Sequence, residues 1–154
     1  MIEYIIVNKE EEFIEAAKLF QEYAAWLNVD LSFQRFDEEL QNLKIMYASP
    51  LGGIILCKQN NEYIGCIAVR PQEDNIAELK RMYIKQAYRR FGIGSELLQQ
   101  SLTLATKAGY KKIRLDTLNT MTPAMNLYKA NGFYTIPAYY YNPEQTAVYF
   151  EKEL

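Results

Sequence analysis

Residues 89–95 read Arg-Arg-Phe-Gly-Ile-Gly-Ser and lie between an expected strand, residues 76–84, and an expected helix, residues 92–108. The two glycines let the backbone approach a ligand closely, and the first turn of a helix offers unpaired N–H groups where the helix dipole favours an anion. The two arginines add positive charge beside that turn. This stretch therefore predicts a pyrophosphate site. The alternative is an ordinary glycine-containing turn beside solvated arginines.

Two common phosphate-binding motifs do not fit this stretch. The dinucleotide fingerprint of a Rossmann fold requires a third glycine at position 97, where the chain has Leu97. A P-loop requires GxxxxGK[ST], which occurs nowhere in the chain. The fold must therefore be interpreted from the elements around this strand–turn–helix unit.

The patterns of apolar residues on either side predict an α/β domain. Helical spacing covers residues 10–27, 35–46 and 122–130, and glutamates occupy the first turn of the first of these helices. Apolar and β-rich runs predict strands at residues 2–7, 54–58, 63–70, 76–84, 112–118, 133–136 and 146–151. The order β-α-α-β-β-β-α-β-α-β-β predicts a mixed sheet with helices on its faces.

Composition limits the class of protein. The chain has 154 residues, 49% hydrophobic and 23% charged, which is typical of one globular domain over residues 1–154. A net charge of −2 and a pI near 5.3 argue against binding to nucleic acid or an anionic membrane. The chain has no histidine, so a Ser-His-Asp triad and an HExxH zinc site are excluded. A tyrosine or a carboxylate is then the expected proton carrier.

The cysteines and the first residues of the chain indicate in which cellular compartment the protein works. Cys57 and Cys66 are too few for a zinc site or a disulfide framework, so we expect two buried free thiols and no metal. The first residues lack the charged start and long apolar run of a signal peptide, and no apolar stretch approaches the roughly 20 residues of a membrane span. We therefore expect a cytoplasmic protein.

A second motif, Ala-Met-Asn-Leu-Tyr-Lys-Ala-Asn-Gly-Phe, occupies residues 124–133. It fits AxxLYxxxGF, and Arg89, Gly92 and Gly94 fit [Q/R]-x-x-G-x-[G/A]. With both motifs in order, nearly the whole chain resembles the GNAT superfamily of acyl-CoA-dependent N-acyltransferases. The tyrosine-rich residues 138–150 resemble a bacterial subgroup whose acceptors are mostly unassigned. The resemblance implies a mixed, mainly antiparallel and twisted sheet flanked by helices, with acetyl-CoA as cosubstrate.

The resemblance also implies where acetyl-CoA binds. Backbone N–H groups of the glycine-rich turn would hold the pyrophosphate, and the residues concerned are Arg89, Arg90, Phe91, Gly92, Ile93, Gly94 and Ser95. The preceding strand would splay from its neighbour and pair with pantetheine through Met82, Tyr83 and Ile84, and the Met82 amide would polarise the thioester carbonyl. Many members carry a cofactor-binding asparagine where this chain has Met121, so we do not transfer that contact.

Tyr128 stands at the family position of the general acid, where a phenol protonates the departing CoA thiolate. The resemblance thus implies direct transfer from acetyl-CoA to an amine, with no covalent enzyme intermediate. The alternative is a tyrosine that only packs a helix face.

Glu78 is the candidate base. It stands eleven positions before Arg89, the register of the catalytic glutamate in the histone-acetylating branch, and would act through water. Strand alternation predicts that it shares one face with Lys80, Met82 and Ile84. The alternatives are an ion pair with Lys80 or an arginine, and deprotonation of the amine by bulk water.

Acceptor residues in this superfamily usually come from the first two helices and the final hairpin. These segments offer aromatic and weakly charged side chains, which fit a small molecule with a primary amine. The candidates are Trp26, Phe33, Tyr139, Tyr140 and Asn142. The alternative is that these tyrosines pack on one another or on a second copy in a homodimer.

Three other functions stay open. The fold could serve as a non-catalytic acyl-CoA sensor or interaction module. The motifs could occur by chance in a different nucleotide-binding α/β domain. Within the enzyme class, the transferred acyl group could be longer than acetyl.

Overall fold

Seven strands form one sheet in the order β1-β2-β3-β4-β5-β7-β6 in the computed structural model, which describes residues 1–154. Neighbouring strands run antiparallel except β4 and β5, which run parallel. The mixed, mainly antiparallel sheet confirms the expected fold class. The strands are β1 Ile2–Ile6, β2 Gly53–Gln59, β3 Glu62–Glu73, β4 Ile76–Ile84, β5 Lys112–Leu118, β6 Tyr134–Ile136 and β7 Ala147–Glu153.

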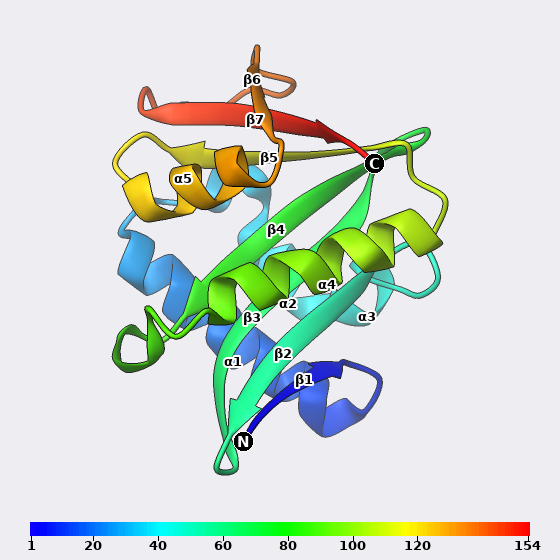
Figure 1. Cartoon of the computed structure of the whole chain (residues 1–154), viewed down its shortest axis with the longest axis vertical. Coiled ribbons are helices and arrows are strands. Elements are labelled where there is room, and N and C mark those ends of the chain that lie inside the picture. Colours follow the sequence, from blue (N-terminus) through cyan, green and yellow to red (C-terminus); the bar gives the residue numbers. More distant parts are fainter.

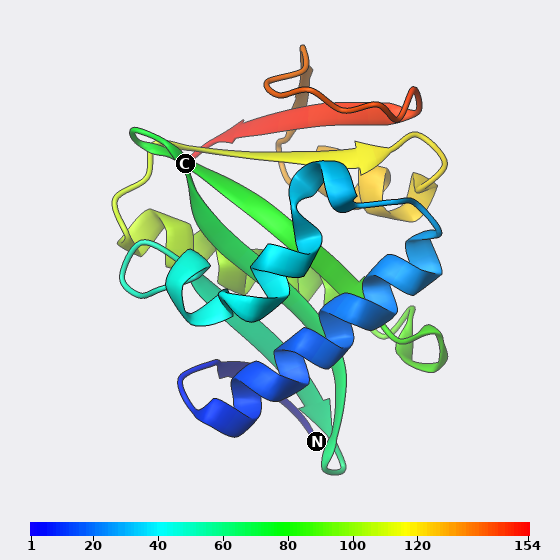
Figure 2. The ribbon, with the colours of Figure 1, turned by 180° about the vertical axis from the view of Figure 1, so that it is seen from behind.

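Helices cover both faces of this sheet. Helices α4 and α5 lie on the face turned to the viewer in Figure 1, and α1, α2 and α3 lie on the opposite face, seen in Figure 2. The helices are α1 Glu10–Leu27, α2 Phe36–Gln41, α3 Leu43–Met46, α4 Ile93–Lys107 and α5 Thr122–Ala130, with 3-10 turns η1 Ser32–Gln34 and η2 Gln86–Tyr88. None of the helices combines the length and the hydrophobicity that crossing a bilayer requires.

Each helical layer packs against its own apolar cluster. The α4-side core contains Leu97 of α4, Tyr128 of α5 and Ile55 of β2. The α1-side core contains Phe20 of α1 and Leu56 of β2. Successive β2 residues thus enter opposite cores, because side chains alternate across a strand.

The two cysteines follow the same alternation. Cys57 belongs to the α4-side core and Cys66 to the α1-side core. Both are free and buried, which confirms the expectation of two buried thiols.

The single helix expected over residues 35–46 is wrong. The backbone of Arg35 is left-handed, with φ 57°, and Asn42 leaves the helical region with φ −128°. The Asn42 side chain donates a hydrogen bond to the carbonyl of Glu38 at 2.7 Å. Asparagine side chains compete in this way with the helical ladder, so the segment divides into two short helices, α2 and α3, and η1 precedes it.

The uniform alternation expected along β4 is also wrong. Arg81 has a left-handed backbone with φ 60°, and the β3–β4 register shifts between Cys66 and Ala68. This bulge adds one residue to β4 and reverses its alternation from that point. Met82 and Ile84 therefore pack on the α4-side core. The side chains of Glu78 and Lys80 remain on the opposite, α1-side face.

Candidate active site

Strands β4 and β5 pair at only three positions, Ile76–Glu78 with Lys112–Arg114. Beyond these positions the strands open into a V, which Figure 1 shows between the green β4 and the yellow β5. The facing main-chain N–H and C=O groups along the V have no ladder partner. An extended ligand can fill such a gap as an added strand would. The structure confirms the splay that the resemblance implied.

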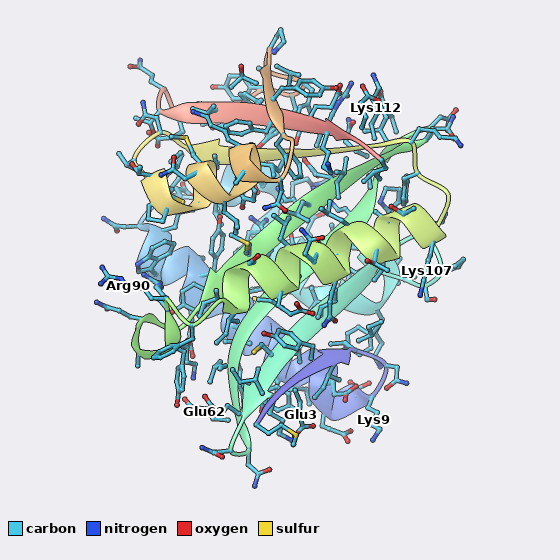
Figure 3. All side chains as sticks on the ribbon, viewed as in Figure 1. Glu3, Lys9, Glu62, Arg90, Lys107 and Lys112 are labelled. Carbon is cyan, nitrogen blue, oxygen red and sulfur yellow. The ribbon has the colours of Figure 1, made fainter.

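Beyond β4 and η2, the chain enters the glycine-rich turn that precedes α4. Arg90 and Gly92 both have left-handed backbones, with φ 74° and 77°. The first intrahelical hydrogen bond runs from the Glu96 N–H to the Gly92 carbonyl at 3.1 Å. The N–H groups of residues 93–95 precede it and are available to an anion. Arg90 is exposed and projects outward from the turn (Figure 3).

Gly94 lets the start of α4 lie close to the end of β4. A Cβ atom at position 94 would lie 3.3 Å from Cδ1 of Ile84. That separation is tighter than ordinary van der Waals contact, so a larger side chain would push α4 away from β4. Local structure thus explains why both motif positions are glycine: Gly92 has a left-handed backbone, and Gly94 lies close to β4.

The Arg89 side chain joins this turn to α1. Its Nε donates a hydrogen bond to the Ile84 carbonyl at 2.8 Å. Its guanidinium carbon lies 4.5 Å from the ring centroid of Trp26 and 5.8 Å from that of Tyr83. A guanidinium stacked on two aromatic rings is held in place, so Arg89 sets the entry angle of the turn.

Tyr128 lies in α5 beside the V. Only 5% of the residue is exposed, and its ring packs against Phe133 and Phe150 with centroid distances of 5.6 and 6.1 Å. Its hydroxyl lies 4.0 Å from Sδ of Met82. Burial raises the pKa of Tyr128 above the ordinary value, so the phenol stays protonated at neutral pH. A protonated phenol next to β4 is the form that a general acid needs.

Glu78 lies on the other face of the sheet, where both of its oxygens are engaged. Arg70 contacts Oε1 at 3.0 Å, and the Tyr139 hydroxyl donates to Oε2 at 2.7 Å. Burial alone would raise the pKa of Glu78, but the charges of Lys80 and Arg70 outweigh it and hold that pKa below the usual range. These contacts favour the ion-pair alternative, while the role of Glu78 as a base stays an untested prediction.

Replacing Glu78 with glutamine separates the two roles. We expect the loss of the Arg70 ion pair to lower the free energy of unfolding by about 1–3 kcal/mol. We expect the pH dependence of kcat to stay unchanged, because the engaged carboxylate takes no proton from the amine. Urea unfolding and a pH–rate profile measure both quantities. A displaced limb of the pH–rate profile would instead establish Glu78 as a base.

An open cleft lies on the α1-side face and reaches β4 and β5 where they diverge. Its lining includes the apolar side chains of Leu27 and Phe33, and the charged residues Lys80 and Asp116. Nζ of Lys80 lies 3.7 Å from Oδ1 of Asp116. Burial lowers the pKa of Lys80, although the charge of Glu78 opposes this shift. This cleft therefore opens toward the V from the side opposite Tyr128.

The expected acceptor residues divide between two places. Phe33 and Asn142 line the cleft, and Tyr140 stacks on Phe33 at its edge. Trp26 does not line it, because its ring lies under Arg89 at the glycine-rich turn. Tyr139 does not line it either, because its hydroxyl is directed to Glu78. The roles of Trp26 and Tyr139 as acceptor contacts stay untested predictions.

Sequence reasoning missed several residues of the cleft, above all Asp116 and Gln34. Polar and apolar residues alternate along β5, which predicts that Asp116 shares a face with Arg114. That pattern does not indicate which residues meet Asp116 from other segments. Gln34 carries no signal, because it lies in a turn that was expected to precede a single long helix.

Comparisons with known proteins agree with this geometry. Residues 16–133 match the family model described as the acetyltransferase (GNAT) family. An uncharacterised N-acetyltransferase of Schizosaccharomyces pombe is 36% identical over 138 residues, covering 88% of this chain and 85% of that protein. Another from Dictyostelium discoideum is 27% identical over 208 positions, covering 96% of both proteins. The similarity therefore extends beyond the bacterial subgroup that the tyrosine-rich run resembled.

Solved structures show the same fold. A GNAT-family acetyltransferase from Staphylococcus aureus Mu50 superposes with a TM-score of 0.82 at 20% identity, covering 99% of both chains. A GNAT-family acetyltransferase from Elizabethkingia anophelis, determined with acetyl-CoA bound, superposes with a TM-score of 0.65 at 22% identity, covering 99% of this chain and 98% of the other.

Proposed function

Because the chain belongs to the GNAT family of acetyltransferases, we propose that it transfers the acetyl group of acetyl-CoA directly to a primary amine of a small molecule. Residues 1–154 act in this proposal as a single N-acetyltransferase domain. Acyl-CoA-dependent N-acyl transfer is the activity of the family. The acetyl group, the small-molecule acceptor and the residue roles are the proposed parts.

The observation that carries the proposal is the position of Tyr128 beside the V. Its hydroxyl lies 4.0 Å from Met82 Sδ, and the chain runs from Met82 at the end of β4 through η2 to the glycine-rich turn. A pantetheine arm that pairs with β4 while its pyrophosphate binds residues 89–95 brings its sulfur toward Tyr128. Gly92, Gly94 and Arg89 support the turn in the ways described above.

In the proposed reaction the acetyl group passes directly from the thioester of acetyl-CoA to the amine, which becomes an amide. The acceptor ammonium first loses a proton to water, and the amine nitrogen attacks the thioester carbonyl carbon while the Met82 N–H stabilises the developing oxyanion. The C–N bond forms, the nitrogen loses a second proton to water, and the C–S bond breaks. Tyr128 gives its proton to the departing thiolate and regains one from solvent. Glu78 is kept outside these steps because both of its oxygens are engaged.

Calorimetric titration with acetyl-CoA tests the cofactor site. We expect micromolar binding by the wild type and its loss in Gly92→Pro, because proline cannot adopt the φ of 77° found at Gly92. Arg89→Ala is expected to weaken binding by about tenfold, because the turn loses its stacking and its hydrogen bond to Ile84.

Arg35→Ala is the matched control, because Arg35 is an exposed arginine paired only with Glu38 at the surface. Its affinity for acetyl-CoA is expected to equal that of the wild type. The absence of binding in the wild type would contradict the proposal and favour a chance motif. Tight binding without CoA release on addition of any amine would favour the non-catalytic sensor.

A further inference from the structure

Four polar side chains from four separate segments close a ring beside the cleft. Lys80 Nζ of β4 donates to Gln34 Oε1 of η1 at 3.1 Å, and Gln34 Nε2 donates to the Tyr140 hydroxyl at 3.1 Å. That hydroxyl donates to Asp116 Oδ2 of β5 at 2.7 Å, and Asp116 Oδ1 lies 3.7 Å from Lys80 Nζ. This set is called the Asp116 ring below. It holds one carboxylate in a single orientation at the point where β4 and β5 diverge.

Asp116 is the more exposed of the two charged ring members at the cleft. Asp116 and Lys80 both line the cleft, but 13% of the Asp116 side chain is exposed against 4% for Lys80. The other lining cation, Arg81, is 2% exposed and engaged by a buried glutamate. Glu144 adds a second carboxylate to the lining and bonds only within its own loop. A ligand that enters the cleft therefore meets negative charge before positive charge.

The ring lies on the opposite side of the sheet from the proposed acid. Asp116 is two residues beyond Arg114, the last β5 position paired with β4. Tyr128 packs in the α4-side core, whereas the Asp116 ring is formed with η1 and the 137–146 loop on the α1 side. An acetyl-CoA molecule bound in the V as proposed above would have its leaving sulfur near Tyr128 and its carbonyl open to the cleft, and an amine entering through the cleft would pass the Asp116 carboxylate.

We propose that Asp116 receives the ammonium group of the acceptor and selects a small monocationic amine that has an apolar body and no carboxylate beside its nitrogen. This inference rests on the proposed acetyl transfer and names the substrate class for that same site. An ammonium donates charge-assisted hydrogen bonds to a carboxylate that is already oriented. A carboxylate on the acceptor would instead be repelled by Asp116 and Glu144.

The walls of the cleft fit the apolar part of such an acceptor. Tyr23, Leu27 and Phe33 are among the apolar residues that line it. The Phe33 ring stacks on Tyr140 with a centroid distance of 6.4 Å and an interplanar angle of 12°. Tyr140 therefore shapes both the apolar wall and the Asp116 carboxylate, which makes it a positioning residue for the acceptor.

Three probes of similar size but different charge test which ligand charge the cleft prefers. Phenethylamine is a cation at neutral pH, O-benzylhydroxylamine is uncharged, and phenylalanine carries a carboxylate beside its ammonium group. Each is titrated by calorimetry into the wild type saturated with CoA, and turnover with acetyl-CoA is a second readout. We expect phenethylamine to bind at least tenfold more tightly than phenylalanine.

Asp116→Asn isolates the carboxylate while conserving its shape. We expect the variant to bind phenethylamine about tenfold to a hundredfold more weakly, and to bind O-benzylhydroxylamine and CoA as the wild type does. Tyr140→Phe keeps the stacking on Phe33 and loses the hydrogen bond to Asp116, so it should show a smaller loss that is again confined to the cation. Asp74→Asn, in the turn between β3 and β4, is the control and should change none of these affinities.

Each contrary outcome has a distinct meaning. Equal losses for the charged and uncharged probes would assign Asp116 a structural role and overturn the inference. So would unchanged affinities in Asp116→Asn, tighter binding of phenylalanine, or no binding of phenethylamine by the CoA-saturated wild type. Failure of the wild type to bind CoA at all would overturn the proposed function, and the inference with it.

Discussion

Replacing Tyr128 with phenylalanine is expected to lower kcat by about 100-fold or more, because the CoA thiolate then leaves without a positioned acid. The affinity for acetyl-CoA should stay within a fewfold of the wild type. The substituted ring keeps its packing against Phe133 and Phe150. The hydroxyl itself makes only a 4.0 Å contact with the Met82 sulfur, so the melting temperature should change little.

Steady-state CoA release measures kcat for this variant, and calorimetry measures its binding of acetyl-CoA. Tyr110→Phe is the matched control, because Tyr110 is a buried tyrosine of the same α4-side core whose hydroxyl donates to the Leu51 carbonyl. That variant should keep full kcat. An unchanged kcat in Tyr128→Phe would remove the acid from the proposed reaction. A comparable fall in both variants would indicate a packing defect.

Replacing Glu39 with glutamine is expected to lower the free energy of unfolding by about 3–5 kcal/mol. Glu39 holds Arg81 in a bidentate pair at 2.8 and 3.0 Å, and also accepts a hydrogen bond from Tyr47 at 3.1 Å. The side chains are 0% and 2% exposed, so glutamine would leave a buried guanidinium without its counter-charge. The same pair holds the left-handed Arg81 of the β4 bulge, a backbone state that persists only under firm constraint.

Urea unfolding of Glu39→Gln and of Glu38→Gln makes the comparison direct. Glu38 pairs with Arg35 at the surface, where the two side chains are 61% and 75% exposed, so its loss should change stability by no more than about 0.5 kcal/mol. Equal effects in the two variants would contradict a special role for the buried pair.

The buried pair also has a pH signature. Burial alone would raise the pKa of Glu39, but the hydrogen bonds and charge of Arg81 outweigh it and lower that pKa. The folded pKa then lies below the unfolded one, so the stabilisation is complete above the unfolded pKa and is lost as pH falls through the folded pKa. As pH falls below about 4.3, the ordinary pKa of an unfolded glutamate, the wild type should therefore lose more stability than Glu39→Gln.

Local patterns predicted most of the elements, because each depends on neighbours in the sequence. The strands at 76–84 and 112–118 and the helix at 122–130 have the bounds that the structure shows. The prediction failed at residues 35–46, where the Asn42 side chain bonds to a helical carbonyl and interrupts the ladder. It failed again at Arg81, whose conformation depends on Glu39, 42 positions away.

The candidate site divides in the same way. The glycine-rich turn and Tyr128 were predictable, since each belongs to a contiguous motif whose backbone geometry is local. The cleft on the α1-side face was not predictable, because side-chain stacking and hydrogen bonds decide where the rings of Trp26 and Tyr139 point. Nothing in the alternation of β5 indicated that Asp116 meets Tyr140.

By itself, the sequence determined the fold class, the family, the turn suited to pyrophosphate and the tyrosine suited to protonate a thiolate. These features are written in short runs of residues, whose spacing sets helix starts, strand faces and left-handed turns. Only the tertiary structure decided which face of β4 each side chain occupies and which carboxylate reaches the cleft. The reason is that these features depend on residues far apart in the sequence. One bulge reverses the alternation of side chains along β4, and the Asp116 ring joins residues that lie 24, 46 and 106 positions apart.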